Sequence, residues 1–515
     1  MNDSHFQDQI IEFLSQPHAF GNVALGVSGP VEKVETHISV IFLAGERAYK
    51  LKRALTLPYL DYSTLELRRL ACEAEIAINR PLAPEIYRGV TPLTRLPGGG
   101  FRLGGPGEPV EYLVEMNRFG QDGLFDHLVG TGGLKPDGLE DLAQTIAAVH
   151  EQAEVSHERG GAAGTGEILA NNGLSLIQAA EDCLDRAKVD ALGRTSRDAL
   201  EGLAPLLDAR HGEGRVRHCH GDLHLGNLVL IKGQPVLFDA IEFSETFSLI
   251  DVFYDLAFLL MDLDHRGEGN GAARVLNRYL DVTGDAGALA CLPLFLSMRA
   301  SVRAYVAASR TAQNDYQREA KAYLDRAVSY LSPPPPRLIA IGGLSGTGKS
   351  SLAAGLAPGL GASPGAFIVR SDAIRKRLAG AGPHERLAPE FYGPDMGQRT
   401  YAQLMEDART GLEAGHSVIA DAVFARPDER AAIARVAGGL GLPFQGLWLD
   451  APAHLLESRV TDRRNDVSDA DAHIVRQQLD YDLGEMEWER MDSSGSFEQI
   501  CQVAARILGL KTPQM

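Results

Sequence analysis

Residues 343–350 read Gly343-Leu344-Ser345-Gly346-Thr347-Gly348-Lys349-Ser350, which is the complete phosphate-loop pattern GxxxxGKS. The apolar run Leu338–Ile341 precedes the pattern, and the helix-like run SSLAAGL begins at its last serine. In this strand–loop–helix order, successive backbone N–H groups and the helix start can face a phosphate. A glycine-rich turn with a chance lysine would not need those flanks. The predicted nucleotide-binding residues are Gly343, Leu344, Ser345, Gly346, Thr347, Gly348, Lys349, Ser350 and Ser351.

In this loop, Lys349 is expected to reach the β- and γ-phosphates, and the Ser350 hydroxyl to bind Mg²⁺. Short apolar runs recur further along the chain, separated by helical patterns, at 367–369, 418–420 and 445–449. Strands that alternate with helices predict a parallel α/β sheet.

The strand predicted at 367–369 is followed by Asp372 at its C-terminal end, and Arg375 lies one helical turn later. Strand C-termini in such a sheet face the ligand crevice. Asp372 is therefore predicted to accept a proton from an attacking hydroxyl, and Arg375 to hold an anionic acceptor group. The alternative is that Asp372 only caps the following helix.

Val418–Asp421 resembles a Walker B strand, which places Asp421 near the Mg²⁺ shell or the acceptor. Arg459, Arg463 and Arg464 follow the strand that ends at Asp450. They are predicted to support the charge of the transferring phosphoryl group as arginines of a small lid. The alternative is a solvated basic helix paired with Asp462 and Asp466.

This half, from Arg337 to about Leu510, resembles the P-loop kinases grouped with zeta toxins, chloramphenicol phosphotransferase, gluconate kinase and the kinase domain of polynucleotide kinase. Its strand–Ser371-Asp372 element with Arg375 matches the acceptor-activating aspartate and nearby arginine of those proteins. The resemblance is specific for the class and leaves the substrate open.

A second motif, residues 220–227 (HGDLHLGN), fits the pattern H-x-D-x₄-N. Phosphoryl transfer needs a carboxylate at the acceptor hydroxyl and an amide on a metal ion. Asp222 fits the first role and Asn227 the second. Asp239 ends the apolar strand 235–238 and is predicted to bridge Mg²⁺ to the phosphates. An Asp/His-rich turn with ordinary hydrogen bonds is the alternative.

Such a site also needs a lysine on a strand and a glutamate on a helix. Lys50 parallels the V-A-I-K pattern and is preferred over Lys52, which lies on the same strand face. Glu75 interrupts an apolar helix stripe and so calls for a buried partner, whereas Glu73 is the weaker choice. Met116 is predicted to lie in the hinge that binds adenine through its backbone.

These residues resemble the aminoglycoside phosphotransferase family over about residues 30–325. The resemblance implies a bilobal protein-kinase-like fold in which Asp251 or Asp255 braces the catalytic loop and His220 acts as a scaffold. The chain departs from the family by having no glycine after Asp239, where it reads DAIE, and Glu242 is expected to take a polar role there. Arg299 and Arg303 are expected to form a solvated helix face or to line the acceptor pocket.

Composition excludes several classes of protein. The 515 residues carry a net charge of −18, so general affinity for nucleic acid or anionic membrane is not expected. The five cysteines are scattered without a CxxC pair, which fits a reducing cytosol. The polar start does not predict a secretory signal, and the apolar stretch 256–261 is expected to be too short to span a bilayer.

We therefore predict two domains. Residues 1–331 would form a bilobal α+β kinase-like half, with a small lobe to about residue 117 and a helical lobe from about 118 to 331. The proline-rich stretch 332–336 would be a linker, and residues 337–515 an α/β P-loop domain.

The leading functional hypothesis is a cytoplasmic enzyme with two ATP·Mg²⁺ sites that phosphorylates small-molecule hydroxyl acceptors. The alternative is a regulatory or scaffold protein with a P-loop ATPase switch and a non-catalytic kinase-like half. A nucleotide-sugar kinase resembling zeta toxins is a third interpretation. The acceptors, the choice of ATP over GTP, and the oligomeric state stay open.

Overall fold

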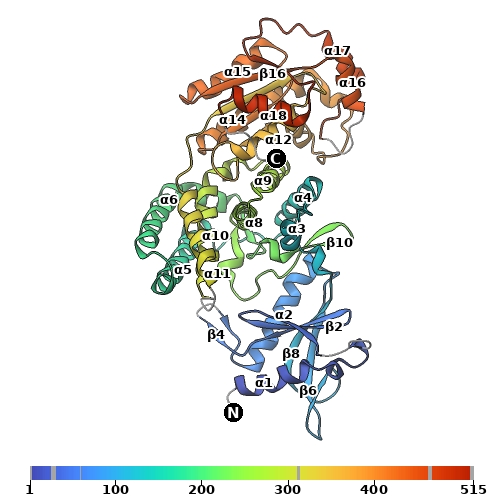
Figure 1. Cartoon of the computed structure of the whole chain (residues 1–515), viewed down its shortest axis with the longest axis vertical. Coiled ribbons are helices and arrows are strands. Elements are labelled where there is room, and N and C mark those ends of the chain that lie inside the picture. Colours follow the sequence, from blue (N-terminus) through green and yellow to red (C-terminus); the bar gives the residue numbers. More distant parts are fainter. Residues whose placement is uncertain (1–2, 25–29, 58–59, 310–313, 462–466, 511–515) are drawn as a thin grey trace. The chain divides into compact units, whose positions relative to one another are not determined.

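The computed structural model describes residues 3–24, 30–57, 60–309, 314–461 and 467–510. The chain forms two compact units, each assembled from separate segments (Figure 1). The first comprises Met1–Leu134, Gln152–Ile168 and Ala209–Asp255, and the second Lys135–Glu151, Leu169–Asp208 and Leu256–Met515. The proline-rich stretch 332–336 thus lies inside the second unit.

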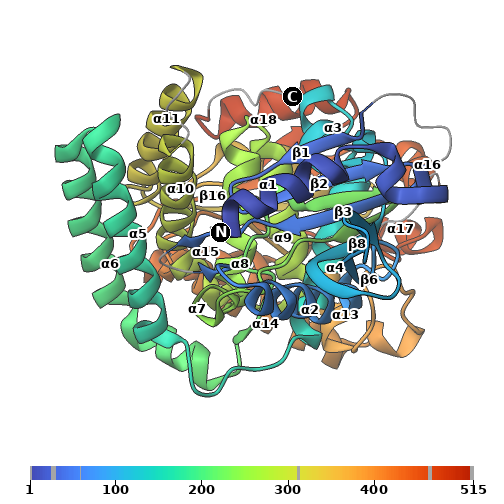
Figure 2. The same ribbon diagram turned by 90° about the horizontal axis from the view of Figure 1, so that it is seen from below.

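The first unit is built on a six-stranded antiparallel sheet with strand order β1-β2-β3-β8-β6-β7. The helix that the apolar stripe around Glu75 predicted is present as α2, and the Thr64 side chain caps it by accepting the Leu67 N–H. Helix α2 packs on β8 and β6 (Figure 2). The bounds are α1 Asp3–Leu14, η1 Pro17–Ala24, β1 Glu32–Glu35, β2 Ser39–Ala44, β3 Arg47–Lys52, β4 Thr56–Leu57, β5 Leu60–Asp61, α2 Leu65–Leu82, β6 Tyr87–Arg95, β7 Phe101–Leu103, β8 Glu108–Asn117, η2 Gln121–Gly123 and α3 Phe125–Thr131.

The HGDLHLGN motif lies in the same unit, between short antiparallel strand pairs. Strand β9 pairs with β12 before and after the motif, and β10 pairs with β11 to bring Asp239 back toward it. The sequence predicted the strand at 235–238, which is present as β11, but not β9 or β12. The bounds are β9 Val216–His218, η3 Leu225–Asn227, β10 Leu228–Ile231, β11 Gln234–Leu237, α7 Glu245–Ser248 and β12 Leu249–Asp251.

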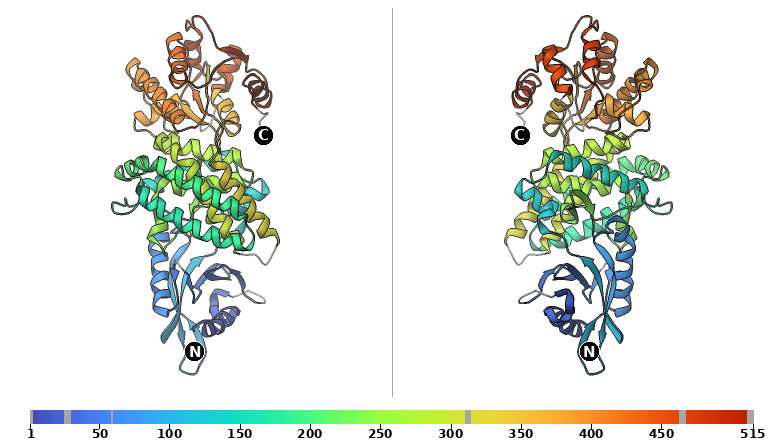
Figure 3. Two further views of the ribbon diagram at one scale, coloured as in Figure 1. Left: turned by 90° about the vertical axis from the view of Figure 1, so that its left-hand side faces the viewer. Right: turned by 90° about the vertical axis from the view of Figure 1, so that its right-hand side faces the viewer.

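Helices dominate the middle of the chain, and most of them belong to the second unit. Helix α8 is almost entirely buried, and α10 packs along α11 (Figure 3). The bounds are α4 Pro136–Gln152, α5 Gly161–Asp182, α6 Arg186–Gly212, α8 Val252–His265, α9 Gly269–Thr283, η4 Ala286–Cys291, α10 Leu292–Ala308 and α11 Asn314–Tyr330.

One of the two alternatives for Arg299 was wrong. Arg299 is not on a solvated face: it is 4% exposed, and its guanidinium lies 4.6 Å from the ring centre of Phe258. Among the described residues, Ala286–Ala308 is long and apolar enough to cross a membrane, but 67% of its apolar window is buried in the fold, as in a core helix.

The P-loop part of the second unit is a five-stranded parallel sheet with strand order β14-β15-β13-β16-β17. All four predicted strands are present, and β17 is an addition. The bounds are β13 Leu338–Gly343, α12 Lys349–Leu356, η5 Ala357–Gly359, β14 Phe367–Arg370, α13 Ser371–Leu378, η6 Pro389–Tyr392, α14 Pro394–Glu413, β15 Val418–Asp421, α15 Pro427–Gly439, β16 Phe444–Asp450, α16 Ala453–Thr461, α17 Ala472–Leu479, β17 Glu489–Asp492 and α18 Phe497–Ile507.

A buried histidine gives the second unit a predicted acid sensitivity. His416 is 0% exposed just before β15, and burial lowers its pKa to about 4 because the charged ring loses its hydration. The unfolded chain binds this proton near pH 6.5, so the unfolded state takes up more protons between pH 6.5 and 4, and stability falls as the pH drops through that window.

We expect His416→Leu to lose less stability than the wild type between pH 7 and pH 5, by up to roughly 2 kcal/mol. Thermal melts of both proteins at the two pH values measure the difference. His157→Leu, at an exposed position, is the matched control. Equal acid-induced drops in melting temperature for wild type and His416→Leu would contradict this assignment.

Candidate active sites

The phosphate loop is held in a conformation that requires glycine. Gly346 and Gly348 have φ angles of 87° and 88°, a region that other residues rarely adopt. A Cβ atom on Gly346 would lie 2.7 Å from the carbonyl oxygen of Leu456 in α16. Helix α12 begins directly after this turn, at Lys349. The loop therefore curls tightly against α16 and leads straight into a helix N-terminus.

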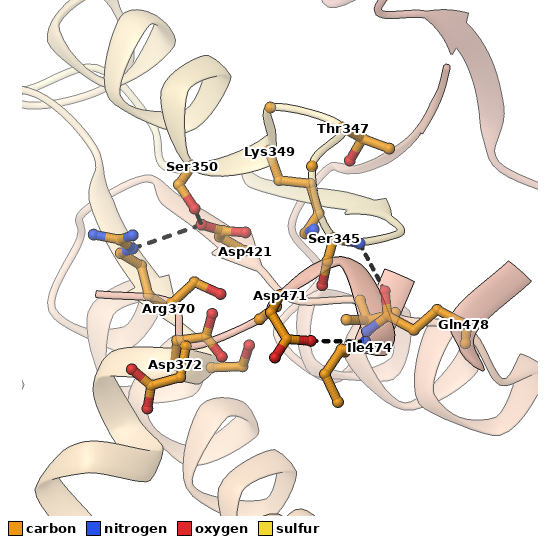
Figure 4. A pocket seen from close by; sticks show the side chains of 18 of the residues that line it. Ser345, Thr347, Lys349, Ser350, Arg370, Asp372, Asp421, Asp471, Ile474 and Gln478 are labelled. Carbon is orange, nitrogen blue, oxygen red and sulfur yellow. Dashed lines mark hydrogen bonds and ion pairs between the residues drawn. The ribbon is translucent and has the colours of Figure 1, made fainter. Parts of the chain in front are cut away.

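Lys349 of the loop lies close to the two metal-binding candidates, Ser350 and Asp421 (Figure 4). Ser350 Oγ donates to Asp421 Oδ2 at 2.6 Å, and Lys349 Nζ donates to the carbonyl oxygen of Leu344 at 3.1 Å. Burial raises the pKa of Asp421, while the positive charges of Arg370 and Lys349 act against this rise. Asp421 is therefore a buried carboxylate whose charge Arg370 and Lys349 compensate only in part.

Asp372 faces the same cavity, whose volume is about 1600 Å³. It lies in the first turn of α13, but the N-cap of that helix is Arg370, so Asp372 is not the cap that the alternative interpretation required. Its carboxylate is 3.3 Å from Arg375, whose guanidinium stacks 5.1 Å from the ring centre of Tyr392. The side chain of Asp372 is 36% exposed and thus accessible to a ligand.

One of the three predicted lid arginines, Arg459, is among the described residues. Arg459 lines the cavity and donates to two backbone carbonyl oxygens, those of Gly346 at 3.4 Å and Ser493 at 2.8 Å. These bonds brace the phosphate loop from α16. Arg463 and Arg464 lie outside the described residues, as do Asp462 and Asp466.

Sequence reasoning missed two groups that line this cavity. Gln478 in α17 accepts the backbone N–H of Ser345 through Oε1 at 2.7 Å (Figure 4). Asp469 accepts from the Leu387 N–H and the Tyr392 hydroxyl and pairs with Lys376 at 3.2 Å. Both connect segments at least 77 residues apart, and no local motif marks them.

In the first unit, the predicted lysine and glutamate meet. Lys50 Nζ lies 3.0 Å from Glu75 Oε1 and 2.5 Å from Asp239 Oδ1. Burial alone would lower the pKa of Lys50, but Asp239 and Glu75 outweigh it and hold the pKa well above its usual value. Glu75 is 0% exposed, whereas Glu73 is exposed and pairs with Arg69.

Lys52 is also part of this cluster, so Glu75 contacts both lysines that the sequence offered. Its Nζ lies 2.7 Å from Glu75 Oε2 and also contacts Glu242, which accepts from the Tyr62 hydroxyl at 2.9 Å. Each oxygen of Glu75 thus has its own lysine. Glu242, in the segment where the related family has glycine, ties the chain after Asp239 to β3.

The catalytic-loop candidates adopt a connected arrangement. Asn227 Nδ2 donates to Asp222 Oδ2 at 3.0 Å. His220 is buried, its Nε2 lies 2.9 Å from the carbonyl oxygen of Phe238, and burial lowers its pKa. Asp255 accepts the backbone N–H groups of His220 and Gly221 at 3.1 and 2.9 Å, so it is the aspartate that braces the loop.

The other carboxylate, Asp251, instead pairs with Arg210 at 2.7 Å. Met116 is buried in β8 opposite Ala48 of β3, within an apolar cluster of the small lobe. That position suits a flat apolar ligand beside Ala48, and the hinge role of Met116 stays a prediction.

Comparisons with known proteins identify both domains. Residues 130–292 match the model of the phosphotransferase enzyme family, and residues 338–482 match an AAA domain model. Uncharacterized proteins from Mycobacterium tuberculosis (strain H37Rv) and Mycobacterium bovis are each 29% identical over 479 residues, covering 90% of this chain and 93% of theirs. The chain therefore combines a kinase-like phosphotransferase domain with a P-loop domain, as its motifs predicted.

Two solved structures are similar in part. A choline/ethanolamine kinase family protein from Mesorhizobium loti has 13% identity and a TM-score of 0.40, covering 64% of this chain and 95% of that chain. A gluconokinase from Sinorhizobium meliloti has 21% identity and a TM-score of 0.25, covering 34% of this chain and 92% of that chain.

The glycine requirement of the phosphate loop can be tested in the full-length protein. We expect Gly346→Ala to weaken nucleotide binding at this loop by at least about ten-fold, because a Cβ there meets backbone and the φ angle is left-handed. Calorimetric titration with ATP measures the loss. Gly438→Ala in α15, where a Cβ meets open space, is the control and should bind normally. Unchanged affinity in Gly346→Ala would show that the loop does not hold nucleotide as folded.

Proposed function

We propose that this chain is an ATP- and Mg²⁺-dependent phosphotransferase with two nucleotide sites, each transferring a γ-phosphoryl group to a hydroxyl of a small molecule. The observation that carries the proposal is the meeting of Lys349, Ser350, Asp421 and Asp372 around one cavity. A phosphate-binding cation, hard oxygen ligands and an accessible carboxylate are the parts that phosphoryl transfer requires.

The residues present fit Mg²⁺ in both places. Hydroxyl, carboxylate and amide oxygens are its preferred protein ligands, and the pairs Ser350 with Asp421 and Asn227 with Asp239 supply them. When bound, the ion neutralises phosphate charge. Asp421 is 4% exposed, and a buried carboxylate needs a cation near it, which supports the assignment.

The remaining steps fall to side chains of the chain itself. Lys349 would release the Leu344 carbonyl and bind phosphate oxygens. Asp372 would orient the acceptor hydroxyl and take its proton, and Arg375 would hold an anionic group of the acceptor. In the other site, Asp222 would take the proton, and Lys50, oriented by Glu75, would bind phosphate.

We further propose that the protein acts in the cytoplasm on small molecules, with no general binding of nucleic acid or membrane. The net charge of −18 supports this, because a protein that binds polyanions along its surface is usually basic. The acceptor identities are not assigned.

The second candidate function is a regulatory protein whose first unit binds nucleotide without turnover. Two contacts favour it. The ion pair with Lys50 occupies Asp239, the metal-ligand candidate, and the Glu242–Lys52 contact ties down the chain that follows Asp239. Acceptor-dependent ADP release from a metabolite library separates the two: a kinase needs the acceptor, whereas an ATPase switch hydrolyses ATP without it.

Asp372 and Lys349 should fail in different ways. In the full-length protein, Lys349→Ala is expected to abolish most nucleotide binding at the phosphate loop, because the cation for the phosphates is lost. Asp372→Asn should retain ATP affinity and lower transfer by roughly 10²–10⁴-fold, the usual effect of removing a general base. Calorimetry and single-turnover transfer assays measure the two effects. Normal transfer by Asp372→Asn would reduce Asp372 to a structural residue.

The first unit should bind nucleotide through metal. We expect full-length Lys349→Ala, in which the other site is silent, to bind ATP only with Mg²⁺, and the added Asp239→Ala change to abolish that binding. Asp239 supplies the carboxylate, and its removal leaves Asn227 as the single protein ligand. ATP titrations with Mg²⁺ and with EDTA measure this. Binding that ignores the metal would favour the regulatory alternative.

A further inference from the structure

Helix α9 packs against an edge of the P-loop sheet, and both belong to the second unit. β14 is one of the two edge strands of that sheet. Asn277 of α9 pairs with the strand through its amide: Nδ2 donates to the Ala366 carbonyl at 3.1 Å, and Oδ1 accepts the Ile368 N–H at 2.6 Å. An edge strand has backbone groups without a neighbouring strand, so these two bonds fix α9 to it.

One helical turn beyond Asn277, on the same face of α9, lies Asp281. Its side chain is 10% exposed, and its carboxylate is 4.0 Å from the guanidinium of Arg370, the last residue of β14. The same guanidinium lies 3.7 Å from Asp421 (Figure 4). Arg370 therefore stands between the carboxylate from α9 and the carboxylate that is the metal-ligand candidate.

The α9 contact also reaches the helix that carries Asp372. Arg377 of α13 donates to the Asp281 backbone carbonyl at 3.4 Å and pairs with Asp407 at 2.8 Å. Burial raises the pKa of Asp281 to about 6, with Arg370, Arg278 and Arg377 acting against this rise, so the carboxylate is mostly charged at pH 7.5.

We propose that Asp281 is a positioning residue of the P-loop site. Its carboxylate attracts the Arg370 guanidinium, weakens the pairing of Arg370 with Asp421, and thereby leaves Asp421 available for Mg²⁺. The inference rests on the proposed function of Asp421 and adds that α9, which lies within the sequence of the kinase-like half, sets the metal requirement of the P-loop site. Without Asp281, the guanidinium would turn fully to Asp421 and compete with the ion.

The physical basis is competition between two cations for one buried carboxylate. A guanidinium less than 4 Å from a carboxylate attracts it appreciably in a partly buried site. A second carboxylate on the other side of the guanidinium weakens this attraction. Asp281, Arg370 and Asp421 thus form a row of three charged side chains that leads from α9 to the nucleotide cavity. Because 89 and 51 residues separate them in the sequence, motif analysis cannot find this row.

The test uses the full-length chain with Asp239→Ala in the background, so that the other nucleotide site does not report. Binding of a fluorescent ATP analogue is titrated with Mg²⁺, and the signal of a Lys349→Ala variant is subtracted. We expect Asp281→Asn to raise the Mg²⁺ midpoint by roughly three- to ten-fold, the range for one partly screened charge pair, with less than about a two-fold change in affinity without metal. Arg370→Gln should remove the effect, so that Asp281→Asn in that background leaves the midpoint unchanged.

Asn277→Ala is the control for a purely structural role. It removes the strand-edge bonds and should lower the melting temperature while leaving the Mg²⁺ midpoint unchanged. A midpoint shift in Asn277→Ala equal to that in Asp281→Asn would overturn the inference, because loosening α9 would then suffice. An unchanged midpoint in folded Asp281→Asn would also overturn it while sparing the proposed function. A wild-type P-loop site that ignores Mg²⁺ would overturn both.

Discussion

The P-loop site depends on the parallel pairing of β13 with β15, whose register sets Ile341 opposite Asp421. Two strands that run side by side in the same direction end at the same edge of the sheet. The loop after β13 and the carboxylate at the end of β15 therefore meet, and Ser350 can bond to Asp421. Pairing of β14 with β15 sets Arg370 opposite Asp421 in the same way, and Asp372 follows two residues later.

A second constraint acts on both candidate sites. Each collects carboxylates in partly buried positions, and such groups need cations near them. Lys50 takes this part beside Asp239, while Arg370 and Lys349 take it beside Asp421. Under the proposed function, a metal ion and a nucleotide would exchange places with these side-chain cations. Metal affinity in each site would then depend on where those cations can go, and this links Asp281 to the P-loop site.

Local sequence predicted the motifs and elements well. The phosphate loop has flanks that can be read from the residues themselves, and the period of α2 identified Glu75 as a buried charge. What the sequence could not predict were the contacts across long separations: Gln478 on the phosphate loop, and Asn277 and Asp281 on β14. Arg299 was misjudged for a related reason, because a helical repeat does not reveal that Phe258 of α8 covers the guanidinium.

The missing glycine after Asp239 has a physical counterpart in the fold. A glycine there would allow the loop to move, but this chain ties the loop down with Glu242 on Lys52 and Tyr62. Asp239 itself has a φ of 62°, so a non-glycine residue already bears the left-handed turn, and its N–H is held by the Tyr87 hydroxyl at 3.0 Å. Because Lys52 holds one oxygen of Glu75, Lys50 can leave Asp239 without uncoupling the glutamate from the sheet. In the proposed kinase site, movement of Lys50 away from Asp239 would then make room for phosphate and metal, while Glu242 keeps the chain after Asp239 tied to β3.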